Sequence, residues 1–498
     1  MLLRHARLRG STDVVDLRIA DGRIAEISSD LVQLHGEHVH DAGGALAIPG
    51  LWDQHVHVGQ VAQNYSRLDT SGATSVDGIL QQVRLALQDR ITLDALVGFG
   101  HRLVDLIDQP TVPALDAVAP TVPVVLIGGD AHHAWMNTAA LRALSLPLRD
   151  GIVGEDEWFA AMPRLGELPG VTEGLESGVR MMQRDAVSRG VVGLVDMEWA
   201  RNWDLWRRRE ALIRVRTASY IADLDAVPGP SGMPLTDDGL VTMGPLKIIT
   251  DGALGSRSAL CRAPYGALGE ETCGILSVPA DELDAALDRA EDLGLDAAVH
   301  AIGDAAVGIA LDALAQVAAR SRHRRHGRVE HAQMLTDADI ATMAGLGITA
   351  SIQPAHLLDD RDATEEIWGD RSEQAFRFAD LARAGVPLAM GSDAPVAPLD
   401  PWLAMSAAVH RSADDRTAWH PQQQLQPRDA LAASTDGMQE LAPGGRGDIV
   451  LLDEDVFEDV PLGAGGIMID AAAREAAARL RDTHPLATFV AGTLVYER

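Results

Sequence analysis

The sequence has little of several features that would define a class of protein. It contains two cysteines in 498 residues, Cys261 and Cys273, without a CxxC pair, so it can build neither a disulfide framework nor a thiolate zinc site. Its apolar runs are of strand length, well short of the ~18 residues that a membrane span needs, which excludes a transmembrane protein. Any metal must therefore be bound by nitrogen and oxygen.

Positive charge is also scarce. The chain has 72 acidic and 42 basic residues, a formal net charge of -30, which repels phosphate backbones and anionic membranes. We expect neither nucleic acid nor a membrane as a partner. The basic start, MLLRHARLRG, is followed by acidic residues rather than by an apolar segment, so no secretory signal is readable. We expect a cytoplasmic protein with a small-molecule substrate.

Lysine is nearly absent, because 41 of the 42 basic residues are arginine and only Lys247 is lysine. GC-rich codon usage explains the arginines but not the exception, although one lysine can also survive by chance. Arginine stays protonated, whereas a buried lysine can become a neutral nucleophile. The sequence therefore marks Lys247 as a candidate for chemistry that a guanidinium cannot perform.

Both ends of the chain show the alternation of apolar residues that is typical of short strands. The expected strands are residues 14–19, 23–27 and 38–48 at the start, and 448–452 and 487–496 at the end. An isolated hairpin is marginally stable, so we expect the two ends to pair. The sequence predicts one small β-sandwich domain made of residues 1–50 and 445–498.

Between these ends, apolar strand-like runs alternate with Ala/Leu-rich helical stretches, the pattern of βα units around a parallel sheet. Eight strands are expected, at residues 46–55, 191–197, 212–220, 245–251, 296–300, 327–331, 347–352 and 386–393. Eight units imply an α/β fold, a (β/α)₈ TIM-type barrel over residues 51–444 with an insertion at about 59–189. The insertion is expected to contain helices such as 76–89 and 138–144.

Polar residues stand where the predicted strands end, which is the face that carries the active site in such barrels. His55 and His57 alternate along the first strand, so both imidazoles point the same way and can bind one ion. A lone HxH pair is weak evidence, since histidines also occur in cores and loops. The full set of polar residues at strand ends also includes Lys247, His300, His331 and Asp393, in barrel order. A purely structural role explains so many residues at these positions less well than a shared site does.

These motifs resemble the amidohydrolase superfamily, and within it the YtcJ-like branch, which includes N-substituted formamide deformylases. The matching segments begin at Ile48 (IPGLWDQHVH), Asp130 (DAHHAWMN), Leu246 (LKIITDGALGSRSA), Val299 (VHAIGD), Val329 (VEHAQ), Ser351 (SIQPAH), Met390 (MGSDAPV) and Asp448 (DIVLLD). They cover nearly the whole chain.

The resemblance implies a divalent metal centre, with zinc as the expected metal and one or two ions per chain. His55, His57 and Asp393 would bind the more buried ion, and His300 and His331 the second. If the centre is binuclear, Lys247 would carry a carbamate that bridges the two ions. Some relatives lack this lysine and use one ion, so the metal count stays open.

Three residues are expected to take part in the reaction itself. Asp393 would take a proton from the attacking water and return it to the leaving nitrogen; a turn or helix N-cap is the alternative for a Ser-Asp sequence. His356, just past the seventh strand, would polarise the scissile carbonyl. His132, on the insertion, would donate a hydrogen bond to a substrate carbonyl, with loop packing as the alternative.

Four residues are expected to bind the substrate. Asp130 and Asn137 match the branch's motif on the insertion, although Ala131 replaces its usual glycine. Trp135 would form a pocket wall, with a place in the core as the alternative. Arg257 could bind a carboxylate in bidentate fashion, and a salt bridge within the fold is equally compatible with its position.

The sequence therefore predicts a metal-dependent amidohydrolase that cleaves a C–N bond, in an amide or a formamide-like small molecule, through a metal-activated hydroxide. A hydrolytic deaminase or a lactone/ester hydrolase is the alternative among enzymes, because the same water can attack any polarised sp² carbon. A catalytically idle barrel with a binding or regulatory role is the alternative of another class. The substrate and the oligomeric state stay open, and a homodimer is the commonest outcome.

Overall fold

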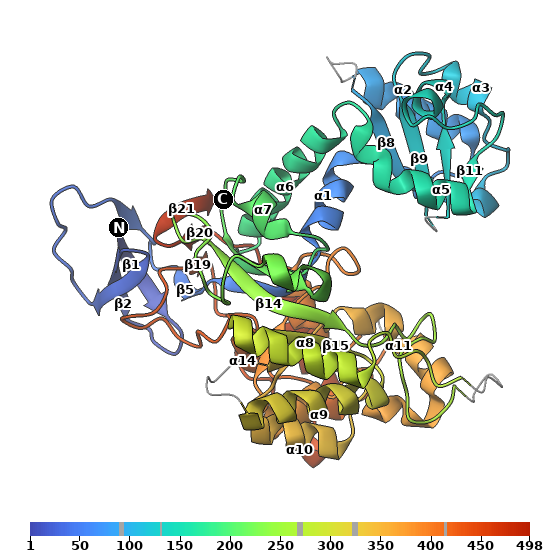
Figure 1. Cartoon of the computed structure of the whole chain (residues 1–498). Coiled ribbons are helices and arrows are strands. Elements are labelled where there is room, and N and C mark those ends of the chain that lie inside the picture. Colours follow the sequence, from blue (N-terminus) through green and yellow to red (C-terminus); the bar gives the residue numbers. More distant parts are fainter. Residues whose placement is uncertain (89–93, 130–131, 266–271, 321–326, 413–415) are drawn as a thin grey trace. The chain divides into compact units, whose positions relative to one another are not determined.

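The computed structural model describes residues 1–88, 94–129, 132–265, 272–320, 327–412 and 416–498 (Figure 1). The chain forms two compact units, one of Met1–Val58 together with Gln183–Arg498, and the other of Gly59–Met182. The second unit lies within the insertion predicted at about residues 59–189. The division falls inside helix α6 (Val171–Ser188).

The larger unit is built around a sheet of eight parallel strands. In sheet order, which is also chain order, they are β6 (Leu51–Val56), β12 (Val191–Asp196), β13 (Arg214–Tyr220), β14 (Val241–Ile249), β15 (Ala297–Ala301), β16 (Gly327–His331), β17 (Thr349–Ile352) and β18 (Leu388–Met390). The first and last strands also meet, through a parallel bridge between Val56 and Ala394. The sheet is therefore nearly closed, which confirms the predicted α/β barrel.

The first predicted strand, residues 46–55, is wrong as one element. It is divided at Gly50 into β5 (Leu46–Pro49), which joins a different sheet, and β6, which begins the barrel. Gly50 donates its amide hydrogen to the Asp448 carbonyl, and a Cβ at this position would collide with the side chain of Val192. Only glycine permits this close approach, so the chain changes sheets there.

Helices accompany the barrel strands. They are α7 (Asn202–Trp206), α8 (Ala280–Leu293), α9 (Asp304–Arg320), α10 (Asp337–Leu346), α11 (His356–Trp368), α12 (Phe378–Arg383), α13 (Pro401–His410), α14 (Pro427–Ala433) and α15 (Asp470–Arg481). In α8 the buried positions are Leu283, Ala286, Leu287 and Ala290, spaced as one helix face, and Gly294 ends the helix with φ 73°. Among the helices of the described ranges, none is both long and apolar enough to cross a membrane.

Strands from both ends of the chain share one sheet, with the order β21-β20-β19-β5-β1-β2-β3 and with β4 also paired to β1 (Figure 1). Their bounds are β1 (Leu2–Leu8), β2 (Val14–Ala20), β3 (Arg23–Ser28), β4 (Val39–Asp41), β19 (Ile449–Leu452), β20 (Ala487–Val490) and β21 (Thr493–Glu497). Leu3, Leu17, Ile449 and Phe489 pack into one apolar cluster of this end sheet. Its arrangement as a separate β-sandwich domain of residues 1–50 and 445–498 stays a prediction.

The sequence did not predict β1, and the reason is local. The pairing of β1 with β2 shifts register between Leu3 and Ala6, and His5 has a left-handed backbone with φ 53°. Such a bulge interrupts the alternation of buried and exposed residues that marks a strand in a sequence.

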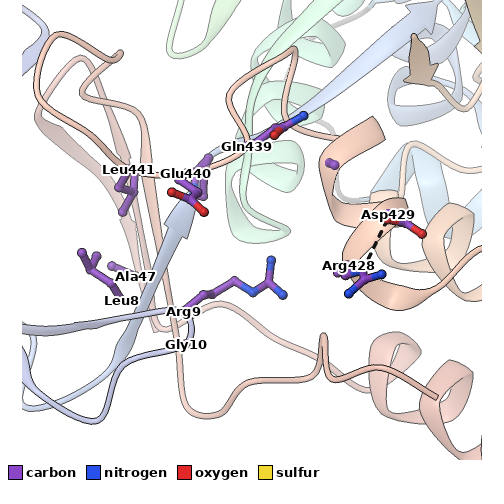
Figure 2. A pocket seen from close by; sticks show the side chains of 11 residues that line it. Leu8, Arg9, Gly10, Ala47, Arg428, Asp429, Gln439, Glu440 and Leu441 are labelled. Carbon is purple, nitrogen blue, oxygen red and sulfur yellow. Dashed lines mark ion pairs between the residues drawn. The ribbon is translucent and has the colours of Figure 1, made fainter. Parts of the chain in front are cut away.

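A cavity of about 490 Å³ lies beside the end sheet (Figure 2). Both of its arginines face carboxylates. Arg9 Nε lies 3.8 Å from an oxygen of Asp455, and Arg428 Nη1 lies 2.7 Å from an oxygen of Asp459. These pairs neutralise the positive charge at this cavity.

The smaller unit has its own sheet, with the order β11-β10-β9-β8-β7. Its elements are α1 (Val58–Ser66), β7 (Leu68–Asp69), α2 (Val76–Gln88), β8 (Leu96–His101), α3 (Val112–Asp116), β9 (Val124–Gly128), β10 (His133–Met136), α4 (Thr138–Ala143), β11 (Val153–Gly154) and α5 (Glu155–Ala161). The sequence predicted helices here but no sheet. Alternate residues of β9 pack into two different apolar clusters, Val125 and Ile127 on one face and Val124 and Leu126 on the other.

Candidate metal centre

The candidate site lies at the carboxyl ends of the barrel strands, and its side chains come from six of the eight strands or from the residues just after them. All eight strands run in the same direction, so these ends meet at one rim of the barrel. The site residues are His55 and His57 at β6, Lys247 in β14, His300 in β15, Glu330 and His331 in β16, His356 at the start of α11, and Asp393 after β18.

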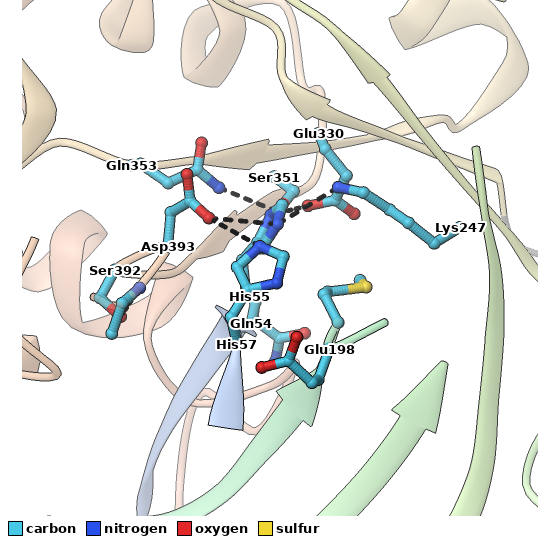
Figure 3. A network of polar contacts seen from close by, with 12 residues as sticks. Gln54, His55, His57, Glu198, Lys247, Glu330, Ser351, Gln353, Ser392 and Asp393 are labelled. Carbon is cyan, nitrogen blue, oxygen red and sulfur yellow. Dashed lines mark hydrogen bonds and ion pairs between the residues drawn. The ribbon is translucent and has the colours of Figure 1, made fainter. Parts of the chain in front are cut away.

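Asp393 is the residue that the histidines share (Figure 3). Its Oδ1 lies 3.4 Å from His55 Nε2 and 3.3 Å from His57 Nε2, and its Oδ2 lies 3.8 Å from His356 Nε2. The backbone of Asp393 is left-handed, with φ 57°, and its amide donates to the His55 carbonyl at 2.7 Å. A non-glycine residue in this conformation is typical of a site where the surrounding fold imposes strain.

His55 is held by Glu330 on the side opposite to Asp393. The Nδ1 of His55 lies 2.8 Å from a Glu330 carboxylate oxygen, and Arg328 forms an ion pair with the same carboxylate. Burial alone would raise the pKa of Glu330, but Arg328 and His55 lower that pKa well below its ordinary value. The carboxylate therefore stays charged and fixes the proton of His55 on Nδ1, which leaves Nε2 as the ligand atom.

Lys247 is buried against the same imidazole. Its Nζ lies 3.2 Å from His55 Nε2, and its side chain is 2% exposed. Burial lowers the pKa of Lys247 to about 8, and burial together with Lys247 lowers the pKa of His55 to about 4. Both groups are therefore easier to deprotonate than in water, as metal ligation or carboxylation requires.

His331 lies on the other side of the site. Its ring packs edge-on against His300, with centroids 4.5 Å apart, and is stacked with His356 at 6.1 Å. The His300 Nε2 is 3.4 Å from Asp251 Oδ1 and 3.4 Å from the Gly252 carbonyl. The structure thus places the predicted ligands His300 and His331 in contact, but directs the His300 Nε2 toward Asp251.

The donor atoms fit a divalent metal. Two groups of three residues could each hold an ion, and within each group the ligand atoms lie within 4.8 Å of one another. The first group is His55, His57 and Asp393, and the second is His331, His356 and Asp393. Within the described ranges, His356 Nε2 is buried without a hydrogen-bond partner. Such an atom is costly in a fold unless something occupies it, and imidazole with carboxylate is a donor set that zinc accepts.

The other predicted site residues belong mostly to the smaller unit. Asp130 lies outside the described residues. His132 is exposed, with Nδ1 3.4 Å from Glu155 Oε2. Trp135 is fully buried and donates from Nε1 to the Thr111 carbonyl at 2.9 Å, which places it in the core of that unit.

Asn137 also has a task within the fold. Its Oδ1 accepts from the amides of Ala140, where it caps helix α4, and of Val124, and its Nδ2 donates to the carbonyls of Ala119 and Val122. These bonds use the whole amide group, so the structure assigns Asn137 to the fold rather than to a substrate.

Arg257 follows β14, in a turn where its backbone is left-handed with φ 53°. Its role in binding a carboxylate stays a prediction.

Sequence reasoning missed Glu330, whose carboxylate contacts His55. The alternation Arg-Val-Glu in β16 places Arg328 and Glu330 on one face, and a left-handed backbone at His331, φ 69°, then interrupts that alternation. Two charged residues on one face of a barrel strand were the available signal.

Trp199 follows β12, is 53% exposed and stacks on Tyr220 with ring centroids 4.6 Å apart.

A nearly closed parallel barrel that carries histidines, a buried lysine and an aspartate on its carboxyl rim defines a metal-dependent hydrolase of the amidohydrolase superfamily. The chain belongs to the amidohydrolase family, whose profile matches residues 38–496.

Similar proteins include hydrolases and one protein not named as a hydrolase, "Protein LONG AFTER FAR-RED 3" of Arabidopsis thaliana, which is 28% identical over 501 residues, covering 89% of this chain and 84% of that protein. The chain is 24% identical over 537 residues to the N-substituted formamide deformylase of Arthrobacter pascens, covering 96% of this chain and 94% of that protein. It is 28% identical over 398 residues to the Bacillus subtilis (strain 168) protein named "Putative amidohydrolase YtcJ", covering 74% of each. The crystal structure of an uncharacterized metal-dependent hydrolase from Pyrococcus horikoshii OT3 superposes with a TM-score of 0.76 at 25% identity, covering 91% of this chain and 97% of that one.

Proposed function

We propose that this protein hydrolyses the C–N bond of a small amide or formamide, with the metal-dependent chemistry of its family. The observation that carries the proposal is the position of Asp393, whose carboxylate faces His55, His57 and His356 at the barrel rim. The similarity to an N-substituted formamide deformylase over nearly the whole chain supports this choice of bond.

Two sets of side chains would hold the metal. His55, His57 and Asp393 form one set, and His331 and His356 form the other with the second oxygen of Asp393. When bound, a divalent ion lowers the pKa of a water molecule and polarises the substrate carbonyl. We propose zinc because the set is rich in imidazole.

Asp393 would move the protons of the reaction. Burial alone would raise its pKa, but His55, His57 and His331 lower that pKa well below the ordinary range, so the carboxylate is ionised at neutral pH. It can take one proton from the water that attacks the carbonyl carbon. It then returns this proton to the nitrogen as the C–N bond breaks, which gives a carboxylic acid and an amine.

Lys247 would supply a bridging anion. With its pKa lowered to about 8, about a tenth of the amine is neutral at pH 7, far more than for an ordinary lysine. A neutral amine adds to carbon dioxide and releases one proton, which leaves a carbamate with two oxygens. Lys247 would then be a ligand for two ions rather than a buried cation beside His55.

The test is a hydrolysis screen of N-formyl, N-acyl and cyclic amide compounds with the zinc-loaded protein and with Asp393→Asn. The exposed Asp312 on α9 provides the matched control, Asp312→Asn. We expect amide hydrolysis in the wild type and in Asp312→Asn, and a loss of about 10³-fold or more in Asp393→Asn, since a general acid-base group contributes about 10²–10⁴-fold.

Two results would contradict the proposal. Turnover of esters or lactones without any amide would assign a different bond. A purified protein that binds less than about one divalent ion per chain would indicate an idle barrel.

A further inference from the structure

The smaller unit contains a cavity of about 530 Å³ with one positively charged side chain. Most of its wall is apolar, including Phe99, Ile127, Leu165 and Val171. The polar part of the wall is grouped near the end of helix α1, where Gln63 and Arg67 lie. A cavity of this size with an apolar wall and a few polar groups is typical of a small-molecule site.

Arg67 is the unusual member of this wall. It is partly buried, and in the described parts of the chain its side chain has neither a hydrogen-bond nor an ion-pair partner. Burial lowers the pKa of Arg67 to about 10, so the guanidinium still carries its charge at neutral pH. Leaving a partly buried charge unpaired costs stability that an anionic ligand would recover.

The lack of a partner does not reflect a shortage of carboxylates, because the chain has 72 acidic residues for 42 basic ones. The cavity beside the end sheet shows the ordinary situation. There Arg9 and Arg428 both line the wall, and Figure 2 shows the ion pair of Arg428 with Asp429. Arg428 also pairs with Asp459, and Arg9 pairs with Asp455.

We infer that this cavity binds a small carboxylate with an apolar tail, with Arg67 holding the carboxylate and the wall around Phe99 and Leu165 holding the tail. A guanidinium offers two parallel N–H donors that match the two oxygens of a carboxylate. The apolar wall then selects against small inorganic anions, which would leave it exposed to water.

This inference does not depend on the proposed hydrolysis, because it concerns residues of the smaller unit alone. Carboxylates also bind metal ions, so the experiment must separate the two places. We would measure binding of hexanoate and of 1-hexanol, its uncharged analogue, by calorimetry on the zinc-loaded full chain and on the same protein after chelation. 1-Hexanol has no bond that an amidohydrolase would cleave.

The variants are Arg67→Met, which keeps an unbranched apolar stem without the charge, and Arg67→Lys, which keeps the charge without the fork. Arg84→Met is the control, since Arg84 is exposed on α2 and is not part of this wall. We expect hexanoate to bind at least about tenfold more tightly than 1-hexanol to the wild type, which is about 1.4 kcal/mol. Arg67→Met should lose this preference, Arg67→Lys should keep part of it, and Arg84→Met should keep all of it.

Hexanoate binding should persist after chelation. The inference would be overturned if hexanoate and 1-hexanol bound equally, or if Arg67→Met bound hexanoate like the wild type. Binding that vanished on chelation and returned with zinc would assign the ligand to the metal centre instead. No binding of hexanoate up to about 10 mM would also reject the site. Should Arg67→Met fail to fold, as shown by its thermal unfolding, the Arg67→Lys comparison decides.

Discussion

The imidazole of His55 lies between two charged groups, with Glu330 2.8 Å from its Nδ1 and Lys247 3.2 Å from its Nε2. Glu330 fixes the ring and its tautomer, so the lone pair of Nε2 is directed to the side where Lys247 and Asp393 meet. A carboxylate in this position also makes an imidazole a stronger ligand. Glu330 would therefore act on a bound metal through His55.

Glu330→Gln should weaken metal binding. The amide keeps the shape of the side chain but not its charge, so His55 loses its fixed tautomer and Arg328 loses its partner. Loss of such a supporting residue costs about 10–100-fold in metal affinity. Titration with a chromophoric chelator measures this directly, and Glu366→Gln, at an exposed position of α11, is the control. Wild-type zinc affinity in Glu330→Gln would show that the carboxylate only supports the fold.

Lys247→Arg and Lys247→Ala should both lose activity by about 100-fold or more. Loss of a residue that supports a metal ligand already costs about 10–100-fold, and loss of the ligand itself should cost at least as much. Arginine keeps the charge but cannot form a carbamate, so both changes remove the same ligand. Metal content per chain and amide hydrolysis are the measurements. A short carboxylate such as propionate should restore part of the rate to Lys247→Ala but none to Lys247→Arg. Near wild-type activity in Lys247→Arg would mean that the side chain is a structural cation.

The barrel could be predicted from the sequence because each strand is an apolar run followed by a polar residue at its carboxyl end. That pattern located His300 and His331 within one residue of the observed strand ends. The pattern failed at Gly50, where two strands follow each other without a polar residue between them. The boundary is marked only by the close approach of Gly50 to Val192, which lies far away in the sequence. Contacts between distant segments leave no local periodicity to detect.

The site was predicted less completely than the fold. The metal-binding residue types are visible as motifs, whereas the role of Glu330 depends on which face of β16 points toward His55. Asn137 shows the opposite case, because its motif suggests a substrate-binding residue, whereas in the structure its amide makes four hydrogen bonds within the fold. Motif spacing alone does not separate these cases.

Trp199→Ala should reduce the binding of substrates that carry an apolar or aromatic group. The indole is half exposed after β12 and stacks on Tyr220, the strand neighbour of Lys247. Removing such a surface should raise KM by about 2- to 10-fold for aromatic N-substituted formamides, with a smaller effect on kcat, because stacking contributes about 0.5–1.5 kcal/mol. Trp199→Phe should keep a KM close to that of the wild type, because it retains an aromatic ring. N-methylformamide, which has no large apolar group, is the control substrate. An equal change in KM for both substrates would reject a stacking role.

Asp196→Asn should change how the stability of the protein depends on pH. Burial raises the pKa of Asp196 to about 6, although Trp206 Nε1 and the Glu198 amide donate to its carboxylate. The folded state therefore holds this proton more tightly than the unfolded chain, whose pKa is near 4. The stabilising contribution is fully present below about pH 4 and is lost as the pH rises through about 6, a change of about 3 kcal/mol in the free energy of unfolding.

Chemical denaturation at pH values from 4 to 7 should show that the free energy of unfolding falls more steeply with pH for the wild type than for Asp196→Asn. Asp204→Asn, at an exposed position of α7, should follow the wild type. Parallel curves for wild type and Asp196→Asn would mean that the Asp196 carboxylate is ionised throughout this range.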